Sequence, residues 1–171
     1  AGKDKGYNIV SEKTPSNILY FENLIKIYPT AKFVFVLRNP LSVVSSLKTV
    51  RDKILLKNKK TSQNYTKNIV TSTFFVNRCI ESGFKCLNHF PEKIHLILYE
   101  DLVSDPKEET KKLFDFLDVK WHQDVLSPKK NATSAKDMRL TSDFWYDENL
   151  YNRNIDKTSL NKWEHNLELY E

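Results

Sequence analysis

One short stretch of the sequence combines the residue types that bind phosphate in proteins. Arg38 ends an apolar run, and Asn39-Pro40 follows it as a typical helix start. On the expected helix, hydroxyl side chains share one face and apolar side chains the other: Ser42, Ser45, Ser46 and Thr49 against Val43, Val44, Leu47 and Val50. Backbone N–H groups at the helix start, the hydroxyls and Arg38 together predict a phosphate site, with the hydroxyl face directed away from the core. A solvated face with a salt-bridged arginine fits the same pattern, so the pattern alone leaves both interpretations open.

The segments around Arg38 alternate between helices and buried strands. Two short apolar runs, 32–37 and 94–99, are typical of strands that helices cover on both faces. Helices are expected at four places: 17–28, from Pro40 onward, 66–87, and after Asp105-Pro106. This alternation predicts an α/β fold in three layers, a parallel sheet with flanking helices. From 119 to 157 the pattern weakens, which predicts a long loop region.

Length and composition limit the remaining choices. The 171 residues, 40% of them hydrophobic, predict a single domain over 1–171. The net charge of +5 suits an anionic ligand, but the sequence has no recognised nucleic-acid motif, so nucleic acid is not an expected partner. Cys79 and Cys86 would lie about 10 Å apart on one helix and the histidines are isolated, so we expect free thiols and no metal. No apolar run reaches the roughly 18 residues that span a bilayer, which predicts a soluble or cytoplasmic chain and leaves an anchor before it open.

Three ordered segments resemble the sulfotransferases that use 3′-phosphoadenosine 5′-phosphosulfate (PAPS). The first consists of an opening tetrapeptide, a helix, a strand and a helix start: Glu12-Lys13-Thr14-Pro15, then Ala31 to Pro40, with Ser46 eight residues after Arg38. In that family an arginine at the strand end and a serine on the helix hold the 3′-phosphate of the donor. The resemblance assigns these two roles to Arg38 and Ser46.

The second and third segments extend the resemblance towards the nucleotide. Tyr99 opens a stretch similar to the family's Y-E-D-L-x-x-D-P sequence, which implies that it lies near the nucleotide. An aromatic residue at a strand end, with its acidic neighbours satisfying turn amides, is an equally good interpretation. The stretch from Lys157 through Lys162 and Trp163 resembles the C-terminal loop and helix that close over the nucleotide, although Asn161 stands where a glycine is usual. Trp163 also fits the apolar stripe of a terminal helix.

The opening tetrapeptide Glu12-Lys13-Thr14-Pro15 resembles the carbohydrate sulfotransferases of the heparan-sulfate type more than the small-phenol enzymes. This resemblance implies that Lys13 faces the transferring sulfuryl group, where a fixed ammonium stabilises the negative charge on the sulfuryl oxygens and the leaving phosphate. Glu12 is a candidate base for the acceptor, and a structural salt bridge is its alternative role.

The Gly-rich phosphate loop that begins these domains finds no match in the sequence. We therefore expect a sulfotransferase fold of the P-loop nucleotide-binding type that is N-terminally incomplete here and is completed by a preceding segment or another chain. The predicted function is sulfuryl transfer from PAPS, with adenosine 3′,5′-bisphosphate as product, to a hydroxyl or amine of an acceptor, a carbohydrate being one candidate. The alternative is a catalytically inactive nucleotide-binding or interaction domain of the same fold. Acceptor-binding loops are expected at 57–66 and 119–157.

Overall fold

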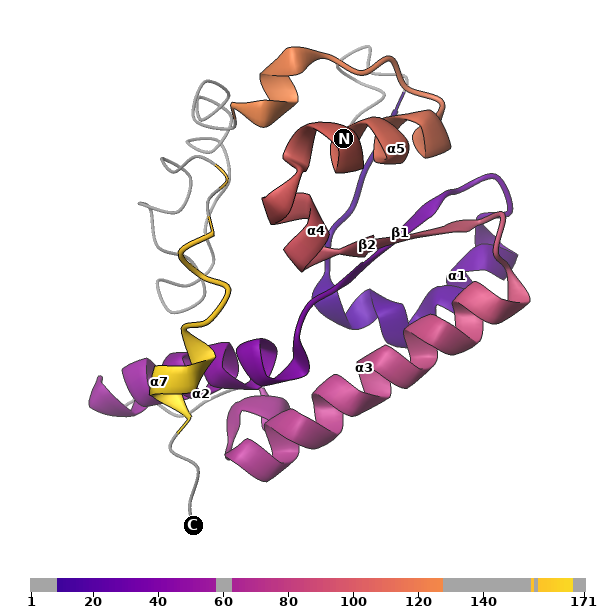
Figure 1. Cartoon of the computed structure of the whole chain (residues 1–171). Helices are drawn as coiled ribbons and strands as arrows, with labels where there is room; N and C mark the ends of the chain where they lie inside the picture. Colours follow the sequence, from indigo (N-terminus) through magenta and orange to yellow (C-terminus); the bar gives the residue numbers. More distant parts are fainter. Residues whose placement is uncertain (1–8, 58–62, 128–154, 156, 168–171) are drawn as a thin grey trace.

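The computed structural model describes residues 9–57, 63–127, 155 and 157–167 (Figure 1). The described helices and strands follow in this order: η2 (Pro15–Tyr20), α1 (Phe21–Ile27), β1 (Phe33–Leu37), α2 (Pro40–Leu56), η3 (Asn64–Thr66), α3 (Ile69–His89), β2 (Ile94–Leu98), α4 (Tyr99–Ser104), α5 (Pro106–Leu117), η4 (Gln123–Leu126) and α7 (Trp163–Asn166). Most of the predicted loop region, residues 128–154 and 156, lies outside the described residues, and its beginning contains η4.

The two strands are parallel neighbours, as the sequence predicted. Their register pairs Phe33 with Ile94 and ends with Leu37 opposite Leu98. Parallel strands need a crossover connection, and here α2 and α3 supply it. The α/β class with a parallel sheet is therefore confirmed, and the carboxyl ends of the two strands meet at one edge.

Helices lie on both sides of the sheet, with α1 and α3 on one side and α4 and α5 on the other (Figure 1). The first side holds the main apolar core, which comprises Ile18, Phe21, Ile25, Phe35, Cys86 and Ile94. On the other side the His95 ring stacks on Phe116 of α5, with ring centroids 5.2 Å apart. Burial lowers the pKa of His95, although the charge of Glu109 opposes this shift. On this side α5 packs against β2, and Val36 of β1 is 53% exposed, so the expected cover on both faces is incomplete there.

Gly83 marks the closest approach of α3 to β1. A Cβ atom at this position would lie 2.5 Å from two ring carbons of Phe35, well inside ordinary contact distance. The Phe35 ring also packs edge-on against Phe84, with ring centroids 5.8 Å apart. Glycine at position 83 thus lets the helix backbone rest directly on the aromatic ring of the strand that leads to Arg38.

Two of the predicted helix starts are confirmed by their caps. Asn39 Oδ1 accepts a hydrogen bond from the Leu41 N–H at 2.9 Å, and Asp105 Oδ1 accepts one from the Glu108 N–H at 3.2 Å. The segment predicted as one helix over 17–28 is a 3₁₀ turn, η2, followed by α1. Pro15 starts that turn earlier than expected.

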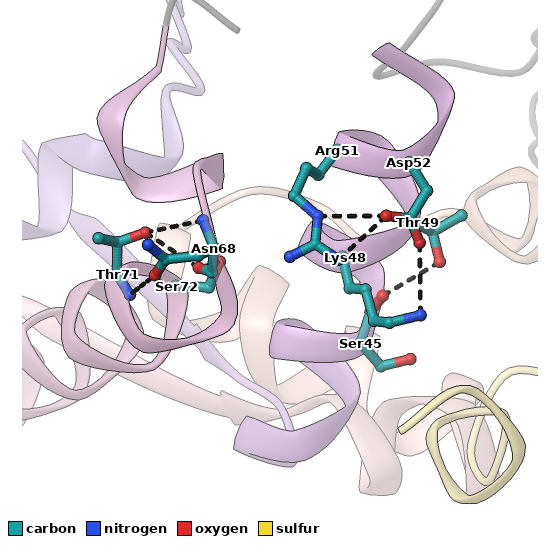
Figure 2. Close-up of polar contacts among 8 residues, drawn as sticks. All are labelled: Ser45, Lys48, Thr49, Arg51, Asp52, Asn68, Thr71 and Ser72. Atoms are coloured by element: carbon teal, nitrogen blue, oxygen red, sulfur yellow. Dashed lines mark hydrogen bonds and ion pairs between the residues drawn. The ribbon is translucent and has the colours of Figure 1, made fainter. Parts of the chain in front are cut away.

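The long helix α3 starts at Ile69, three residues later than predicted, because a capping box sets its first turn. Asn68 Oδ1 accepts from the Thr71 N–H at 2.8 Å, and Thr71 Oγ1 accepts from the Asn68 N–H at 3.2 Å (Figure 2). The hydroxyl of Ser72, which is buried, donates to the Tyr65 carbonyl at 2.7 Å. These bonds satisfy the helix start and fix η3 against it.

Both cysteines on α3 are free thiols, as expected. Cys86 is buried in the main core and Cys79 is partly buried. Burial raises the pKa of both thiols, so both stay protonated at neutral pH and pack as apolar side chains. No helix in the described part of the chain is long and apolar enough to cross a bilayer.

Candidate functional site

The strand register brings two of the predicted binding residues together. Arg38 follows β1 and Tyr99 follows β2, so the parallel pairing that ends at Leu37 and Leu98 places them side by side. The guanidinium carbon of Arg38 lies 4.4 Å from the centroid of the Tyr99 ring, which is cation–π geometry. A planar guanidinium held over an aromatic ring loses little further freedom when it binds an anion at its edge.

A segment 121 residues further along the chain contacts the same arginine. We call residues 157–167 the C-terminal strap. Arg38 Nη2 donates to the Ser159 carbonyl at 2.6 Å, and Ser42 Oγ donates to the Leu160 carbonyl at 3.3 Å. At the far end of the strap, Leu167 packs against a small apolar cluster of α2 and α3, and α7 lies across α2 (Figure 1). The structure thus places the third predicted segment next to the first.

The hydroxyl face of α2 is only partly directed away from the core. Ser42 is 5% exposed and Ser45 is 3% exposed, whereas Ser46 and Thr49 are exposed. The expectation of a fully outward hydroxyl face is therefore wrong for Ser42 and Ser45. At Ser42 the physical reason is the strap, which the periodicity of one helix could not reveal.

Ser46 lies on α2 two turns beyond Arg38 and keeps an exposed hydroxyl. Further along the same helix, two cations pair with one carboxylate. Asp52 accepts hydrogen bonds from Arg51 at 3.0 Å and from Lys48 at 3.3 Å (Figure 2). Burial raises the pKa of Asp52, but these hydrogen bonds and charges outweigh it and hold the pKa below 3.8. Asp52 is therefore ionised at neutral pH and already paired.

Arg38 retains donor capacity for a further anion. Its Nε atom is buried and has no hydrogen-bond partner among the described residues, while Nη2 gives one hydrogen bond to the strap. A guanidinium carries five N–H donors, so several remain for phosphate oxygens. A buried donor without a partner costs free energy, and an anionic ligand at this position would recover it.

A second contact joins the turns that follow the two strands. The backbone N–H of Asn39 donates to Glu100 Oε1 at 2.9 Å. The sequence offered the possibility that the acidic residues after Tyr99 satisfy turn amides, and the structure shows that Glu100 does so, at a turn 61 residues away.

The remaining predicted site residues are exposed or only partly buried. Glu12 and Lys13 precede η2 and are exposed, and the Glu12 carboxylate accepts hydrogen bonds from the Thr14 hydroxyl and the Asn17 amide. The strap carries the other three within seven residues: Lys157 and Lys162, which are exposed, and Trp163, which is half-buried. The described contacts place α7, which begins at Trp163, against α2, and the roles of the three residues stay predictions.

No group of three or more histidines, cysteines, aspartates or glutamates within the described ranges is arranged to hold a metal ion. At the carboxyl edge of the sheet the described residues provide a cationic group with donors to spare, the guanidinium of Arg38, which suits a phosphate. These residues define a candidate anion site at the carboxyl edge of a parallel sheet, where ligands bind in open α/β folds.

Comparison with known proteins identifies the class to which this fold and site belong. Residues 1–123 match the model of the Sulfotransferase family, so the chain belongs to that family. A solved structure of similar fold is the sulfotransferase domain from the curacin biosynthetic pathway, with a TM-score of 0.63 and 21% sequence identity. That similarity covers 94% of this chain and 56% of the other. The predicted sulfotransferase fold is thereby confirmed.

Two relatives share the name "Putative protein-tyrosine sulfotransferase". The protein from Caenorhabditis briggsae is 26% identical over 116 residues, and the one from Caenorhabditis elegans is 26% identical over 114 residues. Each match covers 67% of this chain, but only 38% and 41% of the respective relative. The chain thus spans about two fifths of the length of these relatives.

Proposed function

We propose that this chain is part of an enzyme that transfers a sulfuryl group from PAPS to an acceptor. The observation that carries the proposal is Arg38, which is stacked on Tyr99, fixed by the strap and left with a buried Nε donor. Membership in the Sulfotransferase family supports the same reaction class.

Arg38 and Ser46 are proposed to hold the 3′-phosphate of the donor. Arg38 directly precedes the N-cap of α2 and Ser46 lies on that helix, whose start adds the positive end of a helix dipole. Tyr99 orients the guanidinium and lies beside the nucleotide. The strap is proposed to approach the nucleotide from the opposite side, because the backbone of the strap already reaches Arg38 and Ser42. The side chains proposed to contact the nucleotide from there are Lys157, Lys162 and Trp163.

The donor supplies the sulfuryl group and a leaving phosphate. Lys13 is proposed to stabilise the negative charge that develops on both during in-line transfer. Glu12 holds hydrogen bonds from Thr14 and Asn17 at the start of η2, and these contacts favour its structural role over that of a base.

The acceptor is proposed to be a hydroxyl group. Both nematode relatives carry the name of protein-tyrosine sulfotransferases, which favours the phenol of a protein tyrosine over a carbohydrate. Turnover with a tyrosine-containing peptide and with a heparan-type oligosaccharide, each with labelled PAPS, compares the two acceptor classes directly. Binding of the nucleotide without turnover of either acceptor would support the inactive nucleotide-binding domain instead.

Calorimetry with two nucleotides tests the donor site. The chain is expected to bind adenosine 3′,5′-bisphosphate more tightly than adenosine 5′-monophosphate, which lacks the 3′-phosphate. Arg38→Ala should weaken binding of the bisphosphate by about 2–5 kcal/mol and leave the monophosphate almost unchanged. Arg78→Ala is a matched control, because this exposed arginine on α3 contacts only the Phe74 ring among the contacts described for its guanidinium. Equal affinity of the wild type for both nucleotides would contradict the proposed site.

A further inference from the structure

Glu100 connects the two turns from which the donor site is built. It lies in the first turn of α4, directly after Tyr99, and its carboxylate accepts the backbone N–H of Asn39 at 2.9 Å. Asn39 directly follows Arg38 at the end of β1. The contact therefore joins the neighbours of the two residues whose side chains stack on each other.

The Asn39 N–H needs an acceptor from outside its own helix. Asn39 is the N-cap of α2, and in a capping box the side chain of the third helical residue accepts the N–H of the cap residue. Here that third residue is Ser42, whose hydroxyl donates to the Leu160 carbonyl of the strap, while the acceptor described for the Asn39 N–H is Glu100. Glu100 supplies the missing acceptor from α4.

The bond from Glu100 also fixes the backbone of Arg38. The N–H of Asn39 belongs to the peptide group that begins with the Arg38 carbonyl, and a peptide group is planar. Holding this N–H in one direction therefore fixes the rotation about the Cα–C bond of Arg38. Pro40 restricts the other end of the turn, because the residue before a proline is confined to extended conformations.

We propose that Glu100 is a positioning residue for Arg38 and thereby for recognition of the 3′-phosphate. The inference rests on the proposed donor site and adds a residue that would not touch the donor. Without the carboxylate, the Asn39 N–H turns towards water, and the β1–α2 turn no longer holds the guanidinium over the Tyr99 ring. The interaction with the 3′-phosphate weakens, whereas contacts to the rest of the nucleotide do not.

Three variants separate the hydrogen bond from the charge. Glu100→Ala removes both, while Glu100→Gln keeps an oxygen that can accept the Asn39 N–H and removes only the charge. Asp101→Ala is the matched control, because it removes an exposed carboxylate from the same turn of α4. Thermal melts of all variants establish that each is folded before binding is measured.

Calorimetry on the full chain compares adenosine 3′,5′-bisphosphate with adenosine 5′-monophosphate. Glu100→Ala should weaken the bisphosphate about fivefold to tenfold, the size expected for one lost hydrogen bond, and change the monophosphate by less than about twofold. The affinity of Glu100→Gln for the bisphosphate should be no more than about twofold weaker than that of the wild type. Asp101→Ala should match the wild type. Glu100→Gln as weak as Glu100→Ala, or equal weakening of both nucleotides in Glu100→Ala, would overturn the inference.

Amide hydrogen exchange supplies a readout that does not depend on the nucleotide. The Asn39 amide should exchange faster in Glu100→Ala and remain protected in Glu100→Gln.

The binding results distinguish a wrong donor site from a wrong role for Glu100. If the wild type does not prefer the bisphosphate, the donor site itself is wrong. If the wild type prefers it and Arg38→Ala loses the preference, but Glu100→Ala keeps it, only the role of Glu100 is wrong.

Discussion

Replacing Gly83 with alanine tests how closely α3 packs on the strand that leads to Arg38. The added methyl group would lie 2.5 Å from two ring carbons of Phe35, about 1 Å inside the optimal carbon–carbon distance. The Phe35 side chain is 5% exposed and packs against Phe84, so its ring cannot move aside without losing core contacts. Overpacking of this kind costs about 1–3 kcal/mol, and alanine in place of a helical glycine recovers about 0.5–1 kcal/mol. We expect Gly83→Ala to lower the free energy of unfolding by about 1 kcal/mol, or the Tm by about 2–4 °C.

A second background reverses the sign of this effect. Leucine at position 35 lacks the ring atoms that the new methyl group would meet, so in Phe35→Leu the change Gly83→Ala should stabilise the fold by up to about 1 kcal/mol. Asn77→Ala, at an exposed position of α3, reports what alanine contributes to this helix without any core contact. Urea unfolding of the four proteins of the cycle measures the coupling. The reasoning fails if Gly83→Ala stabilises the wild type as much as it stabilises the Phe35→Leu protein.

Three further changes test the caps and charges that support the site. Asn68→Ala should lower the free energy of unfolding by about 1 kcal/mol because it removes the N-cap of α3. Asn68→Asp keeps a good cap, so urea unfolding should show a much smaller loss of stability for this variant. Equal losses in the two variants would argue against the cap. Burial raises the pKa of Asp52, yet Arg51 and Lys48 outweigh burial and hold that pKa below 3.8. The ionised carboxylate therefore stabilises the fold above the unfolded pKa, and this contribution is lost as the pH falls through the folded pKa. Thermal melts from about pH 5 to about pH 3 should therefore show a smaller loss of Tm in Asp52→Asn than in the wild type, and parallel curves would refute the pairing. Burial lowers the pKa of His95 below 6.5, so the unfolded chain takes up the proton first as the pH falls. The wild type should therefore lose stability from about pH 7 to about pH 5. The same pH dependence of stability in His95→Phe would rule out His95 as its cause.

Local sequence signals predicted the elements well where a single residue controls the backbone. Asn39-Pro40 and Asp105-Pro106 marked helix starts that the structure confirms, because capping depends on groups within one turn. The capping box at Asn68 was missed, since its partner is a threonine and not the usual acidic or amide side chain. The 3₁₀ turn that starts at Pro15 was missed, since the segment was predicted as one helix over 17–28.

The site was predictable only in part. The run before Arg38, the spacing to Ser46 and the Tyr99 segment each indicated a residue for the donor, and the register of two parallel strands brings Arg38 and Tyr99 together. The burial of Ser42 could not be predicted, because the cover comes from Leu160 on a segment far along the chain.

The sequence by itself indicated the alternation of helices and strands and the end of the first strand at Leu37, because these depend on short-range patterns, and its motifs carried the resemblance to the family. The second strand was predicted one residue too long, because Tyr99 begins α4. Only the tertiary structure decided which groups share a hydrogen bond: the Ser159 carbonyl with Arg38, and Glu100 with the Asn39 N–H. Such pairs form between segments 61 to 121 residues apart, and their partners are fixed by strand register and helix packing. Arg38 therefore has its chemistry from its residue type, and its orientation from contacts that no local pattern encodes.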